Sequence, residues 1–301
     1  RCYWKKYMSE VVAIPGLIEI YENYDLFILD QWGVMHDGKK GYNSAIKCID
    51  KLIDEKKLLS IISNSSKRKK NTVERLSSLG FNQNDFSEIM TSGEMVWNYL
   101  ANKNNKFVKN LEINCFYIHD YTNEDGKKYI KGLEKFNFVD SINDAHFILA
   151  CTPFPNKKVI DYYPILEKAK NKNLPFICAN PDFSSVDSIN NSLIFCMGAI
   201  SEMYKAIGGK SIILGKPSIE IYLETLKEFD HIKKNRILAI GDSLYHDIQG
   251  ARNFGIDSLL ITSTGIHGEL FDKKYPIWET KGNTLKNLNT KPKFICSEFK
   301  F

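Results

Sequence analysis

The sequence has no cysteine pair in a CxxC arrangement and no cysteine spacing typical of a metal site, although it contains seven cysteines. The odd number argues against a framework of disulfides. Several of these cysteines lie in apolar runs, as expected of buried, reduced thiols in the cytoplasm. No apolar run approaches the roughly 18 residues of a membrane-spanning helix. We therefore expect a cytoplasmic protein with no membrane partner.

A strong excess of charge of one sign is also missing. The 41 Lys and Arg residues face 36 Asp and Glu residues, and the net charge of +5 is spread along the chain. The one dense basic run, residues 67–70, suits either the solvated start of a helix or a segment that attracts phosphate. A nucleic-acid surface needs more clustering than this, so no nucleic-acid partner is expected.

No GxGxxG motif follows the first predicted strand, residues 26–29, which argues against a dinucleotide-binding enzyme. What the sequence does contain is enough apolar residues, 43% against 26% charged, for a sizeable core. Short apolar runs alternate with segments of helical periodicity, the pattern of an α/β fold with a parallel sheet covered by helices. The further predicted strands are 58–62, 115–118, 146–150, 176–179, 212–214, 237–240 and 258–262, the last of the series. The predicted helices are 45–53, 73–79, 94–101, 159–170, 200–207, 218–229 and 247–254, and the predicted surface loops are 102–110 and 121–128.

Polar residues follow four of the predicted strands where each one ends: Asp30, Ser63, Lys216 and Asp242. In an open parallel sheet, ligands bind at the carboxyl ends of the strands, so these side chains are expected to converge. Two carboxylates beside a lysine are a poor arrangement for stability alone, because like charges repel and desolvation is costly. A hard cation such as Mg²⁺, bridging the carboxylates to a phosphate, accounts for the combination.

These residues belong to four ordered segments that together resemble the motifs of the haloacid dehalogenase superfamily. The segments are Asp30-Gln31-Trp32-Gly33-Val34, Ser63 after its strand, Gly215-Lys216-Pro217, and Gly241-Asp242-Ser243 with Asp247. The long insert between the second and third motifs resembles the cap of subfamily IIA, the 4-nitrophenylphosphatase and NagD-like group. Residues 63–65, 91–93 and 180–182 resemble that subfamily as well. The resemblance extends over residues 20–265, and four motifs in order are far more specific than any one.

The resemblance implies a Rossmann-like parallel-sheet core with an inserted α/β cap. The core is expected at residues 1–84 and 209–301, and the cap at residues 85–208. A large cap restricts access to the crevice, so a small phosphorylated metabolite is the expected substrate rather than a protein. Pairing of two copies through their caps, giving a homodimer, is a further expectation from the capped relatives.

The implied activity is that of a Mg²⁺-dependent hydrolase, a phosphatase that forms an aspartyl-phosphate. Asp30 would be the nucleophile, Ser63 would hydrogen-bond the transferring phosphoryl group, and Lys216 would neutralise its charge. The resemblance also assigns supporting residues. Asp30, Asp242 and the backbone carbonyl of Trp32 would hold the metal, Asp247 and Ser243 would support these ligands, and Asn64, Ser65, Asn180 and Asp182 would bind substrate.

Each of these residues also has a structural interpretation. Asp30 suits a loop cap, Ser63 a helix N-cap and Lys216 a plain turn, while Asp247 suits the N-terminal dipole of its helix. Taken together, Asp30, Lys216 and Asp242 favour the functional interpretation. For Ser63 alone the structural one is favoured, and residues 91–93 suit a helix N-cap. For residues 180–182 a turn and a substrate-binding segment are equally supported.

Trp32 departs from the pattern of typical phosphatases of the superfamily, which carry an aspartate at this position. That aspartate protonates the leaving oxygen and then activates water, and an indole can do neither. General acid–base help is worth about 10²–10⁴-fold in rate. Three outcomes stay open: His36 or Asp37 replaces the acid, the substrate has a good leaving group, or the protein has weak or no catalysis and binds phospholigands or partners.

Overall fold

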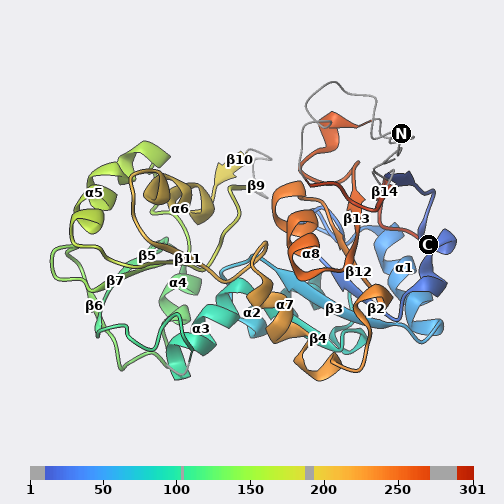
Figure 1. The fold of residues 1–301 in the computed structure, drawn as a ribbon, viewed down its shortest axis with the longest axis horizontal. Helices are drawn as coiled ribbons and strands as arrows, with labels where there is room; N and C mark the ends of the chain where they lie inside the picture. The colour runs from blue at the N-terminus through green and yellow to red at the C-terminus, as the bar shows by residue number, and fades with distance from the viewer. Residues whose placement is uncertain (1–10, 103–104, 187–192, 272–289) are drawn as a thin grey trace, which may run out of the picture. The chain divides into compact units, whose positions relative to one another are not determined.

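The computed structural model describes residues 11–102, 105–186, 193–271 and 290–301 (Figure 1). The chain divides into two compact units, one formed by the described parts of Arg1–Ser60, Leu79–Ser87 and Phe229–Phe301, the other by those of Ile61–Ser78 and Glu88–Glu228. None of the described helices is both long enough and apolar enough to cross a membrane.

A mostly buried parallel sheet forms the centre of the first unit. The strand order is β1-β14-β13-β12-β2-β3-β4, and the pairings from β1 through β2 are parallel. The central strands β2 and β12 are buried along their whole length, which explains why they are continuous apolar runs rather than alternating ones. The strands are β1 (Val12–Ala13), β2 (Leu26–Leu29), β3 (Leu58–Ser63), β4 (Glu88–Thr91), β12 (Ile237–Gly241), β13 (Asp257–Ile261) and β14 (Phe294–Cys296). The chain passes from the first unit into the second within β3, and β4 is counted with the second unit.

The prediction that the strand at 258–262 is the last of the series is wrong. β14 follows it and pairs in parallel with β13 on one side and with β1 on the other. β14 has three residues and β1 has two, so neither is long enough to give a periodic signal in the sequence.

Two helical segments flank this sheet in the first unit. α1 (Asn43–Asp54) buries Ala45, Cys48, Ile49 and Leu52, the spacing of a single apolar face. The predicted helix at 247–254 consists of a π-helical turn, Leu244–Ile248, that continues into α8 (Gln249–Phe254) (Figure 1). Short 3₁₀ turns complete the unit at Leu17–Glu19, Tyr21–Asn23, Gln83–Asp85, Lys234–Arg236 and Gly268–Leu270.

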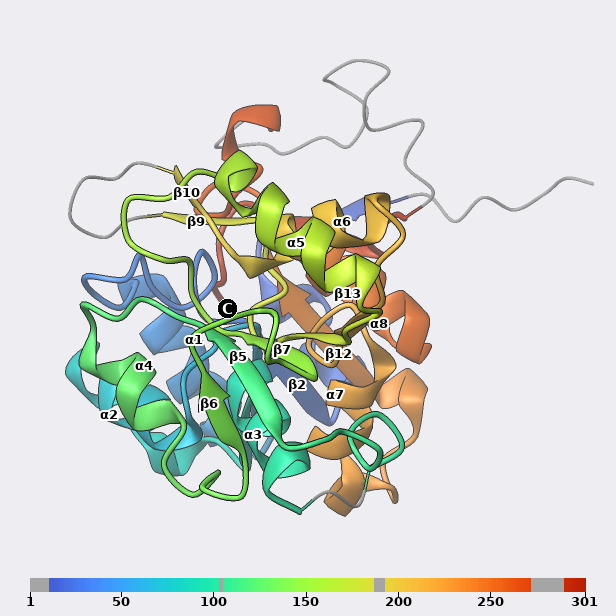
Figure 2. The same ribbon diagram turned by 90° about the vertical axis from the view of Figure 1, so that its left-hand side faces the viewer.

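The second unit contains a five-stranded, fully parallel sheet with the strand order β11-β8-β7-β5-β6. Figure 2 shows β6, β5 and β7 in succession. Its strands are β5 (Asn114–Ile118), β6 (Asn137–Val139), β7 (Phe147–Ala150), β8 (Phe176–Cys178) and β11 (Ser211–Ile213). A separate antiparallel pair is formed by β9 (Ser184–Val186) and β10 (Leu193–Phe195). The parallel, helix-covered sheets of both units confirm the predicted α/β fold.

The helices of the second unit are α2 (Lys69–Ser78), α3 (Ser92–Asn102), α4 (Glu124–Tyr129), α5 (Tyr163–Asn171), α6 (Met197–Ala206) and α7 (Ile219–Thr225), with 3₁₀ turns at Val159–Tyr162 and Lys227–Phe229. α5 and α6 pack on the five-stranded sheet through a shared apolar core. Thr91 accepts the N–H of Glu94 at 2.9 Å through its Oγ1, so the predicted N-cap at residues 91–93 is confirmed.

The prediction of a loop at 121–128 is wrong for its second half, which forms α4. The Asn123 side chain accepts the N–H of Asp125 and caps this helix. The helix has only six residues and contains Gly126, so its composition resembles that of a polar loop.

The basic run at 67–70 leads into α2, and carboxylates hold three of its four cations. Arg68 contacts Glu94 through two nitrogens, at 2.7 and 3.2 Å, and stacks 3.6 Å above the Trp97 ring. Burial alone would raise the pKa of Glu94, but the hydrogen bonds from Arg68 and from the Lys69 backbone outweigh it and lower that pKa. Lys67 pairs with Asp125 and Lys69 with Glu88. These ion pairs fix the start of α2, so the basic run has a largely structural role.

The candidate active site

Two carboxylates lie at the same edge of the first unit's sheet because their strands are parallel neighbours. Asp30 follows β2 directly, and its backbone N–H donates to the carbonyl of Ile240 in β12 at 2.9 Å. Asp242 follows β12. Asp247 lies in the π-helical turn just beyond. One side-chain oxygen from each of these three aspartates lies within 4.8 Å of the other two.

Backbone atoms enclose this acidic cluster closely, which requires glycine at three positions. Gly33 has a φ of +77°, and a Cβ there would lie 2.4 Å from Oδ2 of Asp242. A Cβ on Gly265 would lie 2.3 Å from the Asp242 Cβ, and one on Gly241 would lie 2.1 Å from the Asp247 Cγ. The lack of a side chain at these glycines therefore lets the backbone close around the two buried carboxylates.

Backbone N–H groups partly neutralise the cluster. Ile266 donates to Oδ2 of Asp242 at 2.9 Å, and Ser243 donates to Oδ2 of Asp247 at 3.0 Å. Three carboxylates so close together still carry mutually repelling negative charges. A hard divalent cation would offset them, and an all-oxygen donor set suits Mg²⁺ rather than a softer metal.

The Gly33 contact predicts a specific cost. Gly33→Ala is expected to lower the free energy of unfolding by about 1–2 kcal/mol for the left-handed backbone, and by about 1–3 kcal/mol more for the clash with Asp242. Gly80→Ala is the matched control, because Gly80 has a φ of +93° but only an ordinary 3.4 Å contact with Ile46. Urea unfolding of the two variants measures the difference, and equal costs would contradict a tightly enclosed cluster. Only Gly33→Ala is expected to weaken stabilisation by Mg²⁺.

The second unit brings together predicted residues from three separate segments. The Asn64 side-chain amide donates to Oδ1 of Asp182 at 2.8 Å and to the backbone carbonyl of Lys216 at 3.0 Å. Asn64 and Lys216 are 2% and 3% exposed, so these contacts lie in the interior of the unit. The peptide bond between Lys216 and Pro217 is cis. Asn64 therefore links the second motif, the 180–182 segment and the third motif.

The loop after β3 is a chain of serine turns. Ser63 Oγ accepts the N–H of Ser65 at 3.3 Å, and Ser65 Oγ accepts the N–H of Lys67 at 3.2 Å. The Asn180 side chain accepts the N–H of Asp182 at 3.2 Å, so that segment forms a turn, and its contact with substrate stays a prediction. Because the Asp182 carboxylate also binds Asn64, the turn aims it at the second motif.

His36 and Asp37, the suggested replacements for the missing acid, lie in a tight turn. His36 Nδ1 accepts the N–H of Gly38 at 3.1 Å, and Oδ1 of Asp37 accepts those of Lys39 and Lys40, both at 2.8 Å. Burial alone would raise the pKa of Asp37, but the bonds from Lys40 and Lys39 outweigh it and hold that pKa below its usual value. An ionised, turn-bound carboxylate is a poor proton donor.

One segment of the site was missed by the sequence analysis, the loop that follows β13. Thr264 donates from its Oγ1 to the Gly33 carbonyl at 2.5 Å, and Gly265 and Ile266 contact Asp242. The signal available was the Thr-Gly pair just after an apolar strand, at the same sheet edge as Asp30. The metal-binding role of the Trp32 carbonyl, and the support from Ser243 and Asp247, stay predictions.

Comparison with known families identifies the class of protein. Residues 27–119 match the family model of haloacid dehalogenase-like hydrolases, and residues 213–298 match a second model of HAD-like hydrolases. The two matches together cover more than half of the chain. The chain belongs to the haloacid dehalogenase-like hydrolases.

Solved structures of this family have the same fold. A haloacid dehalogenase-like hydrolase from Brucella suis 1330 is 25% identical, with a TM-score of 0.77 over 95% of this chain and 99% of its own. The 4-nitrophenylphosphatase of Thermotoga maritima is 22% identical, with a TM-score of 0.63 over 91% and 94%. NagD from Escherichia coli K-12 is 18% identical, with a TM-score of 0.61 over 92% and 97%. These neighbours agree with the resemblance to subfamily IIA.

The curated relatives are longer than the part of them that this chain matches. A NipSnap-named protein of Caenorhabditis elegans is 24% identical over 259 residues, which are 76% of this chain but 46% of that protein. The chain therefore spans about half the length of this relative. Phosphoglycolate phosphatase 1A of Arabidopsis thaliana is 25% identical over 262 residues, 81% of this chain and 70% of that protein.

Proposed function

We propose that the protein is a Mg²⁺-dependent phosphatase that acts on a small phosphorylated metabolite through an aspartyl-phosphate at Asp30. The observation that carries the proposal is the cluster of Asp30, Asp242 and Asp247 at the carboxyl ends of adjacent parallel strands. The relatives named as phosphatases of 4-nitrophenyl phosphate and phosphoglycolate support a small phosphate ester as substrate.

The reaction begins at the carboxylate of Asp30. One of its oxygens attacks phosphorus, the ester P–O bond breaks, and the alcohol leaves with its electron pair and takes up a proton. Water then attacks the phosphorus of the aspartyl-phosphate, releasing inorganic phosphate and restoring the carboxylate. A bound Mg²⁺, held by Asp30, Asp242 and the Trp32 carbonyl and supported by Asp247 and Ser243, would supply neutralisation of charge on the phosphoryl oxygens.

The family resemblance also assigns roles to side chains of the second unit. We assign to Ser63 a hydrogen bond to a phosphoryl oxygen, and to Lys216 the neutralisation of phosphoryl charge. Asn64 fixes the Lys216 backbone and Asp182, so it acts as a positioning residue. Contact of Asn64, Ser65, Asn180 and Asp182 with substrate belongs to the same proposal, as does the division into a core and a cap at 85–208.

The indole at Trp32 defines which phosphate esters the protein can cleave. With no carboxylic acid at that position, and with Asp37 held ionised in its turn, the leaving group receives little protonation. Acyl, aryl and enol phosphates have weakly basic leaving groups that depart readily without it. We propose that the physiological substrate belongs to this group. The same residue favours the second candidate function, a catalytically weak or inactive protein that binds phospholigands or partners.

Two further expectations belong to the proposal. The described cysteines are all free and buried, as suits a reducing compartment, and we propose a cytoplasmic location. Pairing of two copies rests on the family resemblance alone.

Hydrolysis of 4-nitrophenyl phosphate with Mg²⁺ and with EDTA tests the function. We expect turnover that depends on the metal, and slower turnover of alkyl phosphates by about 10²-fold or more, because they need the missing acid. If a phosphate mimic binds in a Mg²⁺-dependent manner and no phosphate is released from any ester, the phosphatase is wrong and the binding protein is correct.

A further inference from the structure

The five-stranded sheet of the second unit contains a topological switch point. From β5 the chain passes to β6 on one side, and then returns to β7 on the other side of β5. In open parallel sheets the crevice at such a point, outside the carboxyl ends of the two diverging strands, is where ligands bind. The place to examine is therefore the end of β5 and the end of β7.

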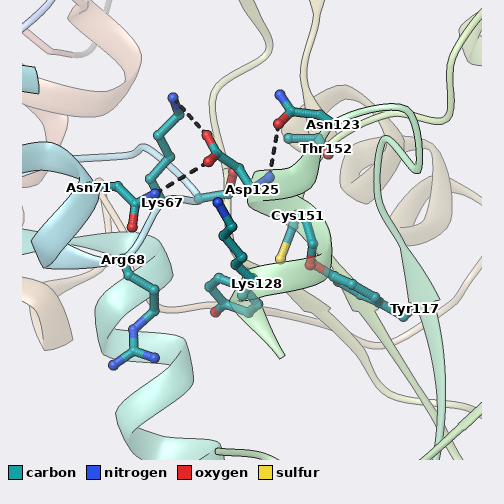
Figure 3. Close-up of a pocket in the computed structure, with 12 residues that line it drawn as sticks. Lys67, Arg68, Asn71, Tyr117, Asn123, Asp125, Lys128, Cys151 and Thr152 are labelled. Carbon is teal, nitrogen blue, oxygen red and sulfur yellow. Dashed lines mark hydrogen bonds and ion pairs between the residues drawn. The ribbon is translucent and has the colours of Figure 1, made fainter. Parts of the chain in front are cut away.

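A small pocket with about 70 Å³ of accessible space, open to solvent at its mouth, lies at this point (Figure 3). Tyr117 from β5 lines it, with Cys151 and Thr152, which follow β7 directly. The other lining residues come from α4 and its cap and from the connection between β3 and α2: Asn123, Asp125, Gly126, Lys128, Tyr129, Ser66, Lys67, Arg68 and Asn71.

The interior of the pocket is uncharged. The Tyr117 and Tyr129 hydroxyls donate to the backbone carbonyls of Gly126 and Gly93, so their hydrogens are already used. Burial raises the pKa of the Cys151 thiol to about 12 and keeps it neutral. The interior therefore offers aromatic surface and a thiol, which suit a flat apolar group.

The rim contains three cations. Lys67 pairs with Asp125, and Arg68 pairs with Glu94, so Lys128 supplies the excess positive charge. Figure 3 shows Lys67 and Asn71 reaching Asp125 across the pocket, at 3.1 and 3.3 Å. Among the residues that the structure describes, Lys128 takes part in no ion pair within 4.0 Å, although its charge contributes to lowering the pKa of Glu124. The half-exposed pair of Lys67 and Asp125 is of the kind worth only about 0–1 kcal/mol, so an incoming anion can compete for it.

One wall of the pocket is firmly fixed. The Thr91 hydroxyl donates to the Lys67 carbonyl at 2.5 Å, and the Gly93 N–H donates to the Ser65 carbonyl at 2.9 Å. A Cβ on Gly93 would lie 2.0 Å from the Ser66 carbonyl oxygen, so no larger residue fits there. On the opposite side, Thr152 accepts the N–H of Asp120 through Oγ1 at 2.8 Å, which fixes that side chain as well. The pocket is thus preformed rather than built on binding.

We propose that this pocket binds a small organic anion, with its apolar part against the tyrosine and thiol surface of the pocket and its carboxylate or phosphate at Lys128 and Lys67. Two sources of such a ligand exist: the non-reacting part of the phosphorylated substrate, or a separate effector. The wall at Ser66 continues directly from Ser63, which favours the substrate. That choice of source rests on the proposed function, whereas binding of the anion does not.

The test uses the full chain and two probes of equal shape, 4-hydroxybenzoate and its neutral amide, 4-hydroxybenzamide. Calorimetric titration should give saturable binding of the anion, with the amide about tenfold weaker or worse, the loss of one charge-assisted contact. Lys128→Met should weaken binding of the anion about tenfold. Lys127→Met is the matched control, because Lys127 is the adjacent lysine of α4, pairs with Glu124 and does not line the pocket.

Each outcome decides one point. Absence of saturable anion binding below about 1 mM, or equal effects of the Lys128 and Lys127 substitutions, overturns the pocket. If the anion binds and also inhibits phosphate-ester hydrolysis competitively, its source is the substrate; noncompetitive inhibition or activation identifies an effector. If the protein binds the anion through Lys128 but hydrolyses no phosphate ester, the pocket is supported and only the proposed phosphatase function is wrong.

Discussion

Replacing Asp30 by asparagine is expected to abolish Mg²⁺-dependent turnover of 4-nitrophenyl phosphate, with kcat falling by at least about 10⁴-fold. The amide has nearly the shape of the carboxylate but is not a nucleophile. It also removes one of three negative charges from the acidic cluster, so the fold should be retained or stabilised. Steady-state kinetics and urea unfolding of the same preparations measure both effects.

Asp37→Asn is the matched control, because Asp37 is also a carboxylate in the segment after β2. Its acceptor oxygen serves the backbone of Lys39 and Lys40, a task that the amide oxygen of asparagine can continue. Its kcat should stay close to that of the wild type. If Asp37→Asn lost most of its activity and Asp30→Asn kept it, Asp37 rather than Asp30 would be the nucleophile.

Replacing Lys216 by methionine is expected to lower kcat by about 10²–10³-fold, the cost of removing one charge-stabilising donor from a transition state. Lys216 is only 3% exposed, and a buried ammonium is costly to desolvate. Methionine keeps the unbranched apolar stem, one heavy atom shorter, and removes the charge, so the protein should still fold and unfold cooperatively in urea. Loss of activity per folded molecule distinguishes a catalytic lysine from a structural one.

Lys227→Met serves as the control for this substitution. Lys227 belongs to the same unit, is exposed and pairs with Glu224 on the preceding turn. Both kcat and stability should be nearly unchanged there. If Lys216→Met instead unfolds the protein and keeps full activity per folded molecule, Lys216 is a structural residue and the assigned role is wrong.

The central part of the fold and of the site was predictable because both depend on local patterns. β2 and β12 are unbroken apolar runs, each followed by an aspartate, and buried parallel strands place those two residues at one edge. The placement of Asp247 beside them was implied by the resemblance to the haloacid dehalogenase motifs, not by the strand pattern. Buried, free thiols followed from cysteines within apolar runs, and this is confirmed for the six described cysteines.

Other parts depend on contacts that a linear pattern does not contain. Thr264 binds Gly33 across 231 positions of the chain, and Ile266 binds Asp242 across 24. The pairing of Asn64 with Asp182 likewise joins segments 118 residues apart. The pocket depends on the order β6-β5-β7, which no local signal gives.

The most direct test of the central claim is acid quenching during turnover of a ³²P-labelled aryl phosphate, followed by peptide mapping. The proposed mechanism predicts acid-stable, base-labile label on the peptide that contains Asp30, formed only with Mg²⁺ and absent from Asp30→Asn. Label on another residue, or metal-dependent release of phosphate with no labelled protein at any quench time, would contradict an aspartyl-phosphate at Asp30.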